Sequence, residues 1–266
     1  MKTKLILVEG LPGFGKTTTA TIIEEILQKQ GVQTKLFLEG NLDHPADYDG
    51  CAYFKLHELP DILREHAQQV EDGWVIPYQK LRDRLPDSQL ADLYARDIYE
   101  LPLELNRRLI ADRWRSFAAA AAQEDTVYIF ECCFLQNPMT VSMIKYGAAY
   151  EESLAYVQEL EQAILPLQPM LVYVNQQDLE SAFRRAVAER PQAWSEGFAQ
   201  YYTQQGFGQE QGYEGLDGTL AVLEERRARE LRILSQLQLA SRQLDNSHLN
   251  RQAYKEELTG LLQGLC

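Results

Sequence analysis

The residues best suited to chemistry stand eight in a row near the start of the chain. Gly10-Leu11-Pro12-Gly13-Phe14-Gly15-Lys16-Thr17 matches the pattern G-x-x-x-x-G-K-[ST] at every fixed position. The three glycines can adopt positive φ and leave room for a phosphate, so successive backbone N–H groups form an anion-binding hollow. In this pattern Lys16 reaches the β- and γ-phosphates and the Thr17 hydroxyl binds Mg²⁺. The pattern predicts that these residues, with Thr18, bind a nucleoside triphosphate.

The flanking residues supply the elements that must position this loop. Lys4–Val8 is an apolar run typical of a buried strand, and Thr17–Gln30 has the apolar spacing of a helix. The helix would direct the positive end of its dipole at the bound phosphates. A glycine-rich turn that merely opens a helix is the alternative, and the strand-loop-helix context disfavours it.

The rest of the chain alternates apolar runs with helical stretches, as a parallel α/β sheet requires. The predicted strands are Lys4–Glu9, Thr34–Glu39, Thr126–Glu131, Met170–Val174 and Ser241–Asp245. The predicted helices that follow the first are Leu103–Ala122, Glu151–Leu165, Asp178–Glu189, Leu216–Leu239 and Asn250–Leu262.

Two segments lack such a pattern, Asn41–Pro60 and Gln204–Gly218. The second carries five glycines and is interpreted as a mobile loop that closes over a ligand, or as a plain surface connection. We expect one α/β domain over residues 1–266, with a substrate-side insertion at 41–103 and a lid region at 178–218.

Acidic residues end three of the predicted strands. Ligands of open α/β sheets bind beyond the carboxyl ends of the strands, so Glu9, Glu39 and Glu131 should gather near the phosphate site. Glu131 follows four apolar residues and is predicted to hold Mg²⁺ together with Thr17, directly or through water. Glu39 is predicted to be the base that positions an acceptor hydroxyl, with Asp43 and His44 as further candidates.

Arginines form a second set of candidates. Arg184 and Arg185 lie on the predicted helix after the fourth strand, with Arg190 beyond them. A guanidinium stabilises the oxygens of a transferring phosphoryl group, so these arginines suit a catalytic lid. Pairing with neighbouring glutamates on the helix surface is the alternative. The arginines between 226 and 232 alternate with glutamates and are interpreted as an exposed helix face.

Composition limits the partners. Asp and Glu number 39 against 26 Lys and Arg, which gives a net charge of -13 and disfavours nucleic acid. The chain has no run of eighteen apolar residues, so we expect no membrane span, and we also expect no signal peptide ahead of the first strand. The four cysteines, without C-x-x-C spacing, are interpreted as reduced thiols of a cytoplasmic protein. A homodimer is left open.

The opening Val8-Glu9-Gly10 and its loop resemble those of thymidylate kinases and deoxynucleoside kinases. Glu39 resembles the acid that these P-loop kinases place beside the acceptor, and Glu131 resembles the acid of their D/E-R motif, although Cys132 replaces the Arg. Arg184 and Arg185 resemble their lid. The resemblance implies a three-layer P-loop NTPase fold, with a five-stranded parallel sheet of order 2-3-1-4-5 and helical insertions.

Two further similarities concern other segments. Asp245-Asn246-Ser247 is similar to the loop that contacts adenine in nucleotide kinases, which implies that Asn246 binds the nucleotide. Phe130–Pro138 is similar to a segment shared by a group of bacterial P-loop proteins, and this similarity implies no substrate.

These residues favour an ATP-dependent small-molecule kinase that uses Mg²⁺ and transfers the γ-phosphoryl group to a hydroxyl or phosphate. A nucleoside or nucleotide is the first expectation for the acceptor, and an antibiotic or other metabolite the second. One alternative is a non-catalytic or hydrolytic ATP-binding regulator. A GTP-binding switch is another, because Asn175-Gln176-Gln177-Asp178 partly matches N-K-x-D and Asp47-Tyr48-Asp49-Gly50 fits D-x-x-G.

Overall fold

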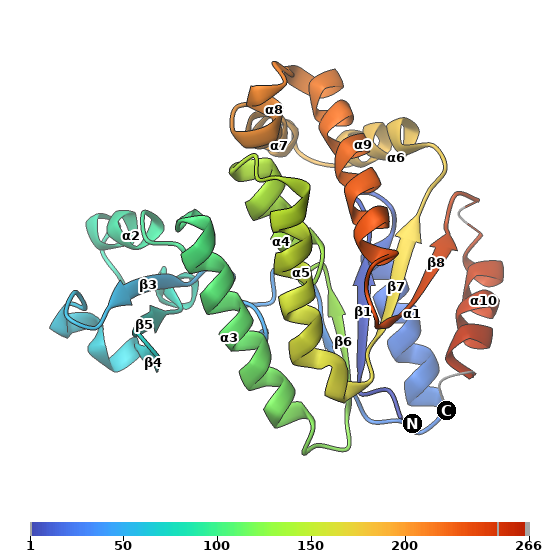
Figure 1. Ribbon diagram of the computed structural model, residues 1–266, viewed down its shortest axis with the longest axis horizontal. Helices are drawn as coiled ribbons and strands as arrows, with labels where there is room; N and C mark the ends of the chain where they lie inside the picture. The colour runs from blue at the N-terminus through green and yellow to red at the C-terminus, as the bar shows by residue number, and fades with distance from the viewer. Residues whose placement is uncertain (1, 249, 264–266) are drawn as a thin grey trace. The chain divides into compact units, whose positions relative to one another are not determined.

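The chain folds into two compact units in the computed structural model, which describes residues 2–248 and 250–263. The first unit comprises Met1–Glu39 and Arg115–Cys266, and the second comprises Gly40–Trp114. Helix α3 (Leu103–Ala121) contributes residues to both (Figure 1). The predicted insertion at 41–103 falls within the second unit, and a single domain over the whole chain remains a prediction.

The first unit is built on a five-stranded parallel sheet. Its strands are β1 (Leu5–Glu9), β2 (Thr34–Phe37), β6 (Val127–Glu131), β7 (Met170–Asn175) and β8 (Ala240–Asp245). They lie in the order β2-β6-β1-β7-β8. Counted in chain order within this sheet, the order is 2-3-1-4-5, as expected. β1 is central, with Leu5 opposite Tyr128 of β6 and Ile6 opposite Met170 of β7.

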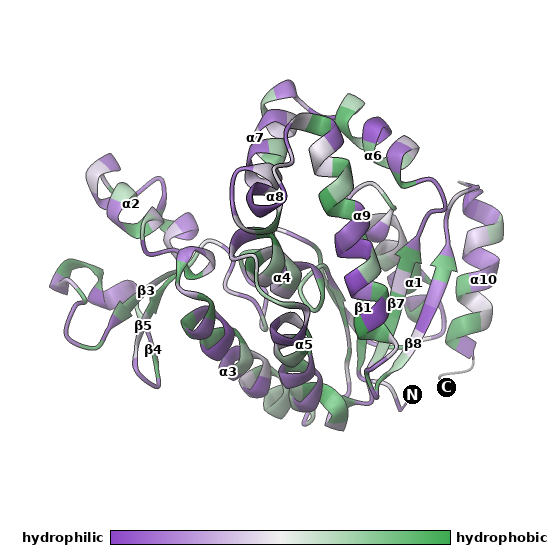
Figure 2. Ribbon diagram, turned by 45° about the horizontal axis from the view of Figure 1, so that its top comes forward, coloured by the Kyte–Doolittle hydropathy of each residue, from purple (hydrophilic) through white to green (hydrophobic). Residues whose placement is uncertain are grey.

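The central strands are continuous apolar runs because both of their faces are covered. Every residue of β1 and β6 is buried, including the terminal glutamates. Figure 2 colours β1 and β7 mainly green, whereas the edge strand β8 carries purple segments. In β8 only Leu244 is buried, which explains why its sequence is partly polar.

Helices cover both faces of this sheet. Helix α1 (Lys16–Lys29) packs on β1, β2 and β6 and against α10 (Arg251–Gln263). The chain runs outward from β1 to β2 but in the opposite direction from β6 to β7 and β8, so right-handed crossovers place the later helices on the other face. The helical elements that connect β6 to β7 and β7 to β8 are α4 (Gln136–Met139), η4 (Thr140–Lys145), α5 (Tyr150–Ile164), η5 (Leu165–Leu167), α6 (Leu179–Ala188), α7 (Gln192–Thr203), α8 (Gly206–Glu210) and α9 (Gly215–Leu234).

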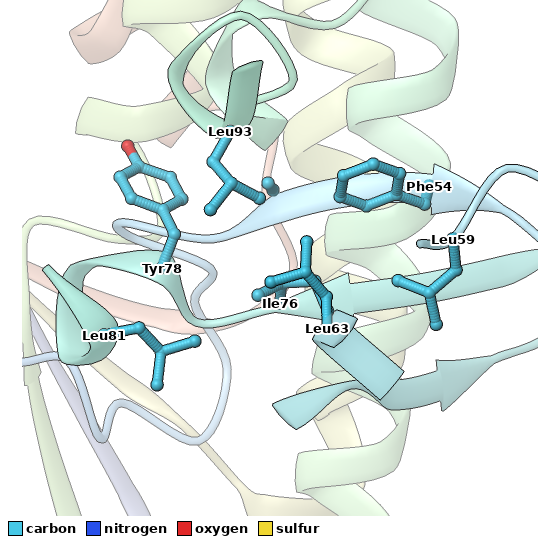
Figure 3. Close-up of a cluster of buried hydrophobic side chains, with 8 residues drawn as sticks. Phe54, Leu59, Leu63, Ile76, Tyr78, Leu81 and Leu93 are labelled. Atoms are coloured by element: carbon cyan, nitrogen blue, oxygen red, sulfur yellow. The ribbon is translucent and has the colours of Figure 1, made fainter. Parts of the chain in front are cut away.

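The second unit contains a small antiparallel sheet, so the expectation of purely helical insertions is wrong. Its order is β3-β5-β4, from β3 (Ala52–Lys55), β4 (Gln68–Val70) and β5 (Gly73–Ile76). Its helical elements are η1 (Asp61–His66), η2 (Tyr78–Leu81), α2 (Asp87–Tyr94) and η3 (Ile98–Glu100). Figure 3 shows its hydrophobic cluster, in which Phe54 and Ile76 of the sheet pack with Leu63 and Leu93.

Two segments differ from their prediction in ways that matter for the site. Part of the glycine-rich stretch Gln204–Gly218, predicted to be a loop, forms α8 and the first turn of α9. The arginines of α9 do not share one exposed face, because Arg226 is fully buried. Glycines at 206 and 215 adopt positive φ at the turns that separate these helices, so they shape turns within a helical segment.

None of the described helices is long and apolar enough to cross a membrane. Cys51, Cys132 and Cys133 are free thiols, and Cys266 lies outside the described residues.

Candidate functional site

The loop Gly10–Thr17 connects β1 to α1 at the carboxyl end of the sheet. Gly10, Gly13 and Gly15 have φ of 143°, 83° and 94°, a region that favours glycine. At Gly10 the backbone of β7 leaves no room for a side chain, because a Cβ would lie 2.3 Å from the carbonyl oxygen of Val174. Among the described residues no side chain caps α1 at Gly15. The N-terminus of α1 is therefore available to an anion.

Lys16 is held inside this loop. Its side chain is buried, and its ammonium donates to the carbonyl oxygen of Leu11 at 3.2 Å. Burial acts to lower the pKa of Lys16, but electrostatic interactions with Cys132, Glu39 and Glu131 outweigh this effect, so the pKa is raised. The lysine keeps its positive charge beside the loop.

Thr17 and Glu131 meet across 114 positions of sequence. The Thr17 hydroxyl donates to Oε1 of Glu131 at 2.6 Å, and Oε2 of Glu131 accepts from the backbone N–H of Glu39 at 3.3 Å. Glu131 is the last residue of β6, which lies beside β1 in the sheet, so strand pairing brings it to the loop. The direct contact between Thr17 and Glu131 is compatible with the prediction that the two side chains hold Mg²⁺ together.

Glu39 lies two residues beyond the end of β2 rather than on its last position. Its side chain is exposed, and its Oε1 accepts from Nε2 of Gln136 at 2.6 Å. Ligand atoms of Glu39, Glu131 and Cys132 lie within 4.8 Å of one another, so this group could hold a metal ion. The oxygens of Glu39, Glu131 and Thr17 are the donors that a hard cation such as Mg²⁺ prefers.

Cys132 stands where the resembling kinases carry an arginine. It is buried, has a positive φ of 72°, and its backbone N–H donates to the carbonyl oxygen of Val8. Burial raises the pKa of its thiol well above the ordinary value. A strained, non-glycine residue at this point turns the chain from β6 toward α4 beside the site.

Glu9 does not join the other two acids. It is buried, and its two oxygens accept the backbone N–H groups of Phe134 at 2.7 Å and Gln136 at 3.1 Å. Its carboxylate fixes the segment that follows β6. The expectation that three strand-end carboxylates gather at the phosphate site is therefore wrong for Glu9.

A cavity of about 550 Å³ opens over the loop, a size that suits a small-molecule ligand. Its lining residues are Pro12, Gly13, Gly15, Lys16, Thr17, Thr18, Glu39, Glu131, Gln136, Thr140, Glu189, Arg190, Trp194, Phe198, Tyr201 and Tyr202. The phosphate-binding loop and the carboxylates of Glu39 and Glu131 thus line one cavity together with side chains of α7. Thr140 begins a π-helical turn, a distortion that is frequent at functional sites.

The wall contributed by α7 is aromatic. Trp194, Phe198 and Tyr202 follow one another at four-residue spacing, which places them on one helix face. Ring centroids of Trp194 and Phe198 are 4.9 Å apart, and those of Phe198 and Tyr202 are 4.2 Å apart at an interplanar angle of 16°. The guanidinium of Arg190 lies 4.3 Å from the Trp194 ring centroid. This aromatic wall was not predicted from the sequence, although the four-residue spacing of its aromatic residues could have indicated it.

The predicted lid arginines lie elsewhere. Arg184 is exposed and pairs with Glu180 at 2.8 Å and Asp217 at 3.1 Å, and it does not line the cavity. Arg185 donates to Oε1 of Gln176 at 3.1 Å. Arg190 is the arginine that lines the cavity.

A second, smaller cavity of about 180 Å³ also borders the loop. Arg185 and Asn246 both line it, together with Gly13, Gly15 and Thr18. Nδ2 of Asn246 donates to the carbonyl oxygen of Phe14 at 2.8 Å. Asn246, predicted to be at the nucleotide, therefore touches the loop itself.

Asp43 and His44 belong to the second unit. Asp43 pairs with Lys80, and Nδ1 of His44 accepts from the backbone N–H of Ala46. His44 is buried within this unit. Burial, with a contribution from the charge of Arg113, lowers the pKa of His44 to about 3 and keeps the imidazole neutral.

The comparisons with known proteins add no assignment: no protein-family model matches the chain, and no curated protein does. The fold is α/β, and its five-stranded parallel sheet with helices is compatible with a nucleotide-binding fold of that class.

Proposed function

We propose that this protein is an ATP-dependent small-molecule kinase of the P-loop class, similar to nucleoside and nucleotide kinases. The observation that carries the proposal is the contact between the Thr17 hydroxyl and Glu131 at 2.6 Å, directly beside the buried ammonium of Lys16. A phosphate-loop hydroxyl and a strand-end acid that share a cavity with a lysine are the parts that phosphoryl transfer uses.

Each residue has a proposed role. The backbone of Gly10–Thr17 and the N-terminus of α1 hold the phosphates, and Lys16 moves from the Leu11 carbonyl to their oxygens. Thr17 and Glu131 hold Mg²⁺, which when bound neutralises charge on the phosphate oxygens. Arg190, at the aromatic wall, takes the place expected of Arg184 near the transferring group.

Glu39 lines the cavity and is the proposed base for the acceptor. Its exposed carboxylate accepts a hydrogen bond from the amide of Gln136, and it can take up the proton of an acceptor hydroxyl. The aromatic wall of Trp194, Phe198 and Tyr202 favours an acceptor with a planar ring, because such rings stack on aromatic side chains. A nucleoside or nucleotide is therefore the first class to test, ahead of an antibiotic or other metabolite.

The test measures ADP release from MgATP with a panel of nucleosides, nucleoside monophosphates and non-aromatic polyols. We expect acceptor-dependent release with ring-bearing acceptors, and a loss of at least about a hundredfold in Lys16→Ala. Arg184→Ala is the matched control, since Arg184 does not line the cavity, and should retain the rate within about twofold. Acceptor-independent release alone would favour a hydrolytic regulator, and no nucleotide binding at all would refute the proposal.

A further inference from the structure

Hydrogen bonds join four buried side chains into a chain that includes Tyr202 of the aromatic wall. It links Tyr202 of α7 to Arg226 and Glu230 of α9 and ends at Tyr173 of β7. Arg226 is 1% exposed and Glu230 is 0% exposed, so an ion pair is held out of water within the first unit. Ion pairs buried this completely need all of their polar atoms satisfied.

The hydrogen bonds within this group of four side chains do not involve every donor of Arg226 and Tyr202. Glu230 accepts from Nε of Arg226 at 2.7 Å and from the Tyr173 hydroxyl at 2.8 Å. Nη1 of Arg226 donates to the Tyr202 hydroxyl oxygen at 2.7 Å. Because a guanidinium accepts no hydrogen bond, the hydroxyl hydrogen of Tyr202 is not used by Arg226. Within the described residues, Nη2 of Arg226 has no partner.

Tyr202, whose hydroxyl hydrogen is not taken up by Arg226, lines the larger cavity. It shares that cavity with Lys16, Thr17 and Glu131, whereas Asn246 lines the smaller cavity. The charge of Arg226 is also among those that act on the Lys16 ammonium, and it acts to lower the pKa of Lys16. A phenol that accepts from a cation becomes a stronger donor through polarisation.

We propose that Tyr202 donates a hydrogen bond to the terminal phosphoryl group of a nucleotide held by the loop, and that Arg226 is the residue that positions this hydroxyl. The inference rests on the proposed function. The terminal group follows from position, because Lys16, which in this loop pattern reaches the β- and γ-phosphates, lines the same cavity as Tyr202. Glu230 accepts from the guanidinium of Arg226 and is itself held by the Tyr173 hydroxyl, so the Tyr202 hydroxyl is oriented before the nucleotide binds.

The experiment compares the dissociation constants of MgATP and MgADP by calorimetry. Tyr202→Phe keeps the ring that stacks on Phe198 and removes only the hydroxyl. We expect its affinity for MgATP to fall about tenfold, as for a hydrogen bond to a charged oxygen, with MgADP unchanged within about twofold. Tyr150→Phe is the matched control, because it also removes a tyrosine hydroxyl that accepts a hydrogen bond, here from Gln236 just beyond the end of α9, and Tyr150 does not line the cavity.

Arg226→Lys tests the positioning role. The lysine keeps a positive charge for Glu230 but loses the fork that reaches Tyr202. It should lower MgATP affinity like Tyr202→Phe, and the double variant should be no weaker than Tyr202→Phe alone. A purely structural role for Arg226 would lower the melting temperature and leave the ratio of the two dissociation constants unchanged.

The outcomes separate this inference from the proposed function. If the unaltered protein binds neither nucleotide, both are overturned. If it binds both and Tyr202→Phe weakens them equally, or not at all, the role of Tyr202 alone is overturned. Additive losses of MgATP affinity in the double variant would overturn the positioning role of Arg226.

Discussion

Glu9 is a buried acid whose hydrogen bonds are structural and which does not line the candidate site. Its carboxyl group is 1% exposed and accepts two backbone N–H groups from the segment after β6. Burial raises the pKa of Glu9 to about 7; the N–H groups of residues 134–136 oppose the rise, and the charge of Glu230 adds to it. This carboxyl therefore titrates near neutrality.

The raised pKa predicts that the contribution of Glu9 to stability falls as pH rises. The unfolded chain releases the proton near pH 4.5 and the folded protein near pH 7, so the contribution is fully present below 4.5 and is lost as pH rises through 7. The loss amounts to about 3 kcal/mol. Urea unfolding from pH 4.5 to 8 should show a smaller decline for Glu9→Gln than for the unaltered protein.

Glu180→Gln is the control for this measurement, because Glu180 is a surface carboxylate paired with Arg184. It should retain the decline of the unaltered protein. A Glu9→Gln variant with an undiminished decline would show that another group is responsible.

At the scale of elements, the loop and β7 must approach within a distance that only glycine allows. Gly10 has φ 143°, and a Cβ would meet the backbone of Val174, which belongs to a central strand and cannot move aside. By contrast Gly31, after α1, has φ 76° with open space around it. Both positions strain a side chain, but only Gly10 adds a clash.

Gly10→Ala should therefore destabilise the protein by about 3 kcal/mol, from backbone strain and overpacking together. Gly31→Ala should cost only about 1 kcal/mol, since it adds strain alone. Urea unfolding at a fixed pH measures both. Equal losses would mean that the close approach of the loop to β7 contributes nothing beyond the φ requirement.

At the scale of the whole molecule, each compact unit contains a buried titratable group, Glu9 in the first and His44 in the second. Their contributions to the free energy of unfolding change in opposite directions with pH. His44 lies in the second unit, where burial and Arg113 lower its pKa to about 3. The unfolded chain takes up the proton near pH 6.5 and the folded unit only near pH 3. The contribution of His44 is therefore present above pH 6.5 and is lost as pH falls, by up to about 5 kcal/mol.

Acid should thus destabilise the second unit through His44. His44→Asn keeps an acceptor for the N–H of Ala46 but does not titrate. Hydrogen exchange of peptides from Gly40–Trp114, followed by mass spectrometry between pH 7 and 4, should show less acid-induced opening in this variant than in the unaltered protein. His66→Asn, at a partly exposed histidine of the same unit, serves as the control. Identical acid sensitivity of His44→Asn would exclude His44 as the cause.

The strand and helix on either side of the loop could be predicted from the sequence alone. Their signals are local: an apolar strand, glycines that permit positive φ, and a helix that follows at once. The same applies to the five strands and, through resemblance, to their order. Thr17 and Glu131 could also be paired in advance, because parallel strands bring their carboxyl ends to one edge of the sheet.

Which charged side chains line the cavity could be seen only in the folded protein. Arg184 and Arg190 look alike in sequence, yet Arg184 turns to Glu180 and Asp217 while Arg190 lines the cavity with α7. Glu9 and Arg226 are buried because neighbouring elements supply their hydrogen-bond partners from distant positions, Phe134 and Tyr202. Side-chain direction and burial depend on contacts between elements, and residue type alone does not encode those contacts.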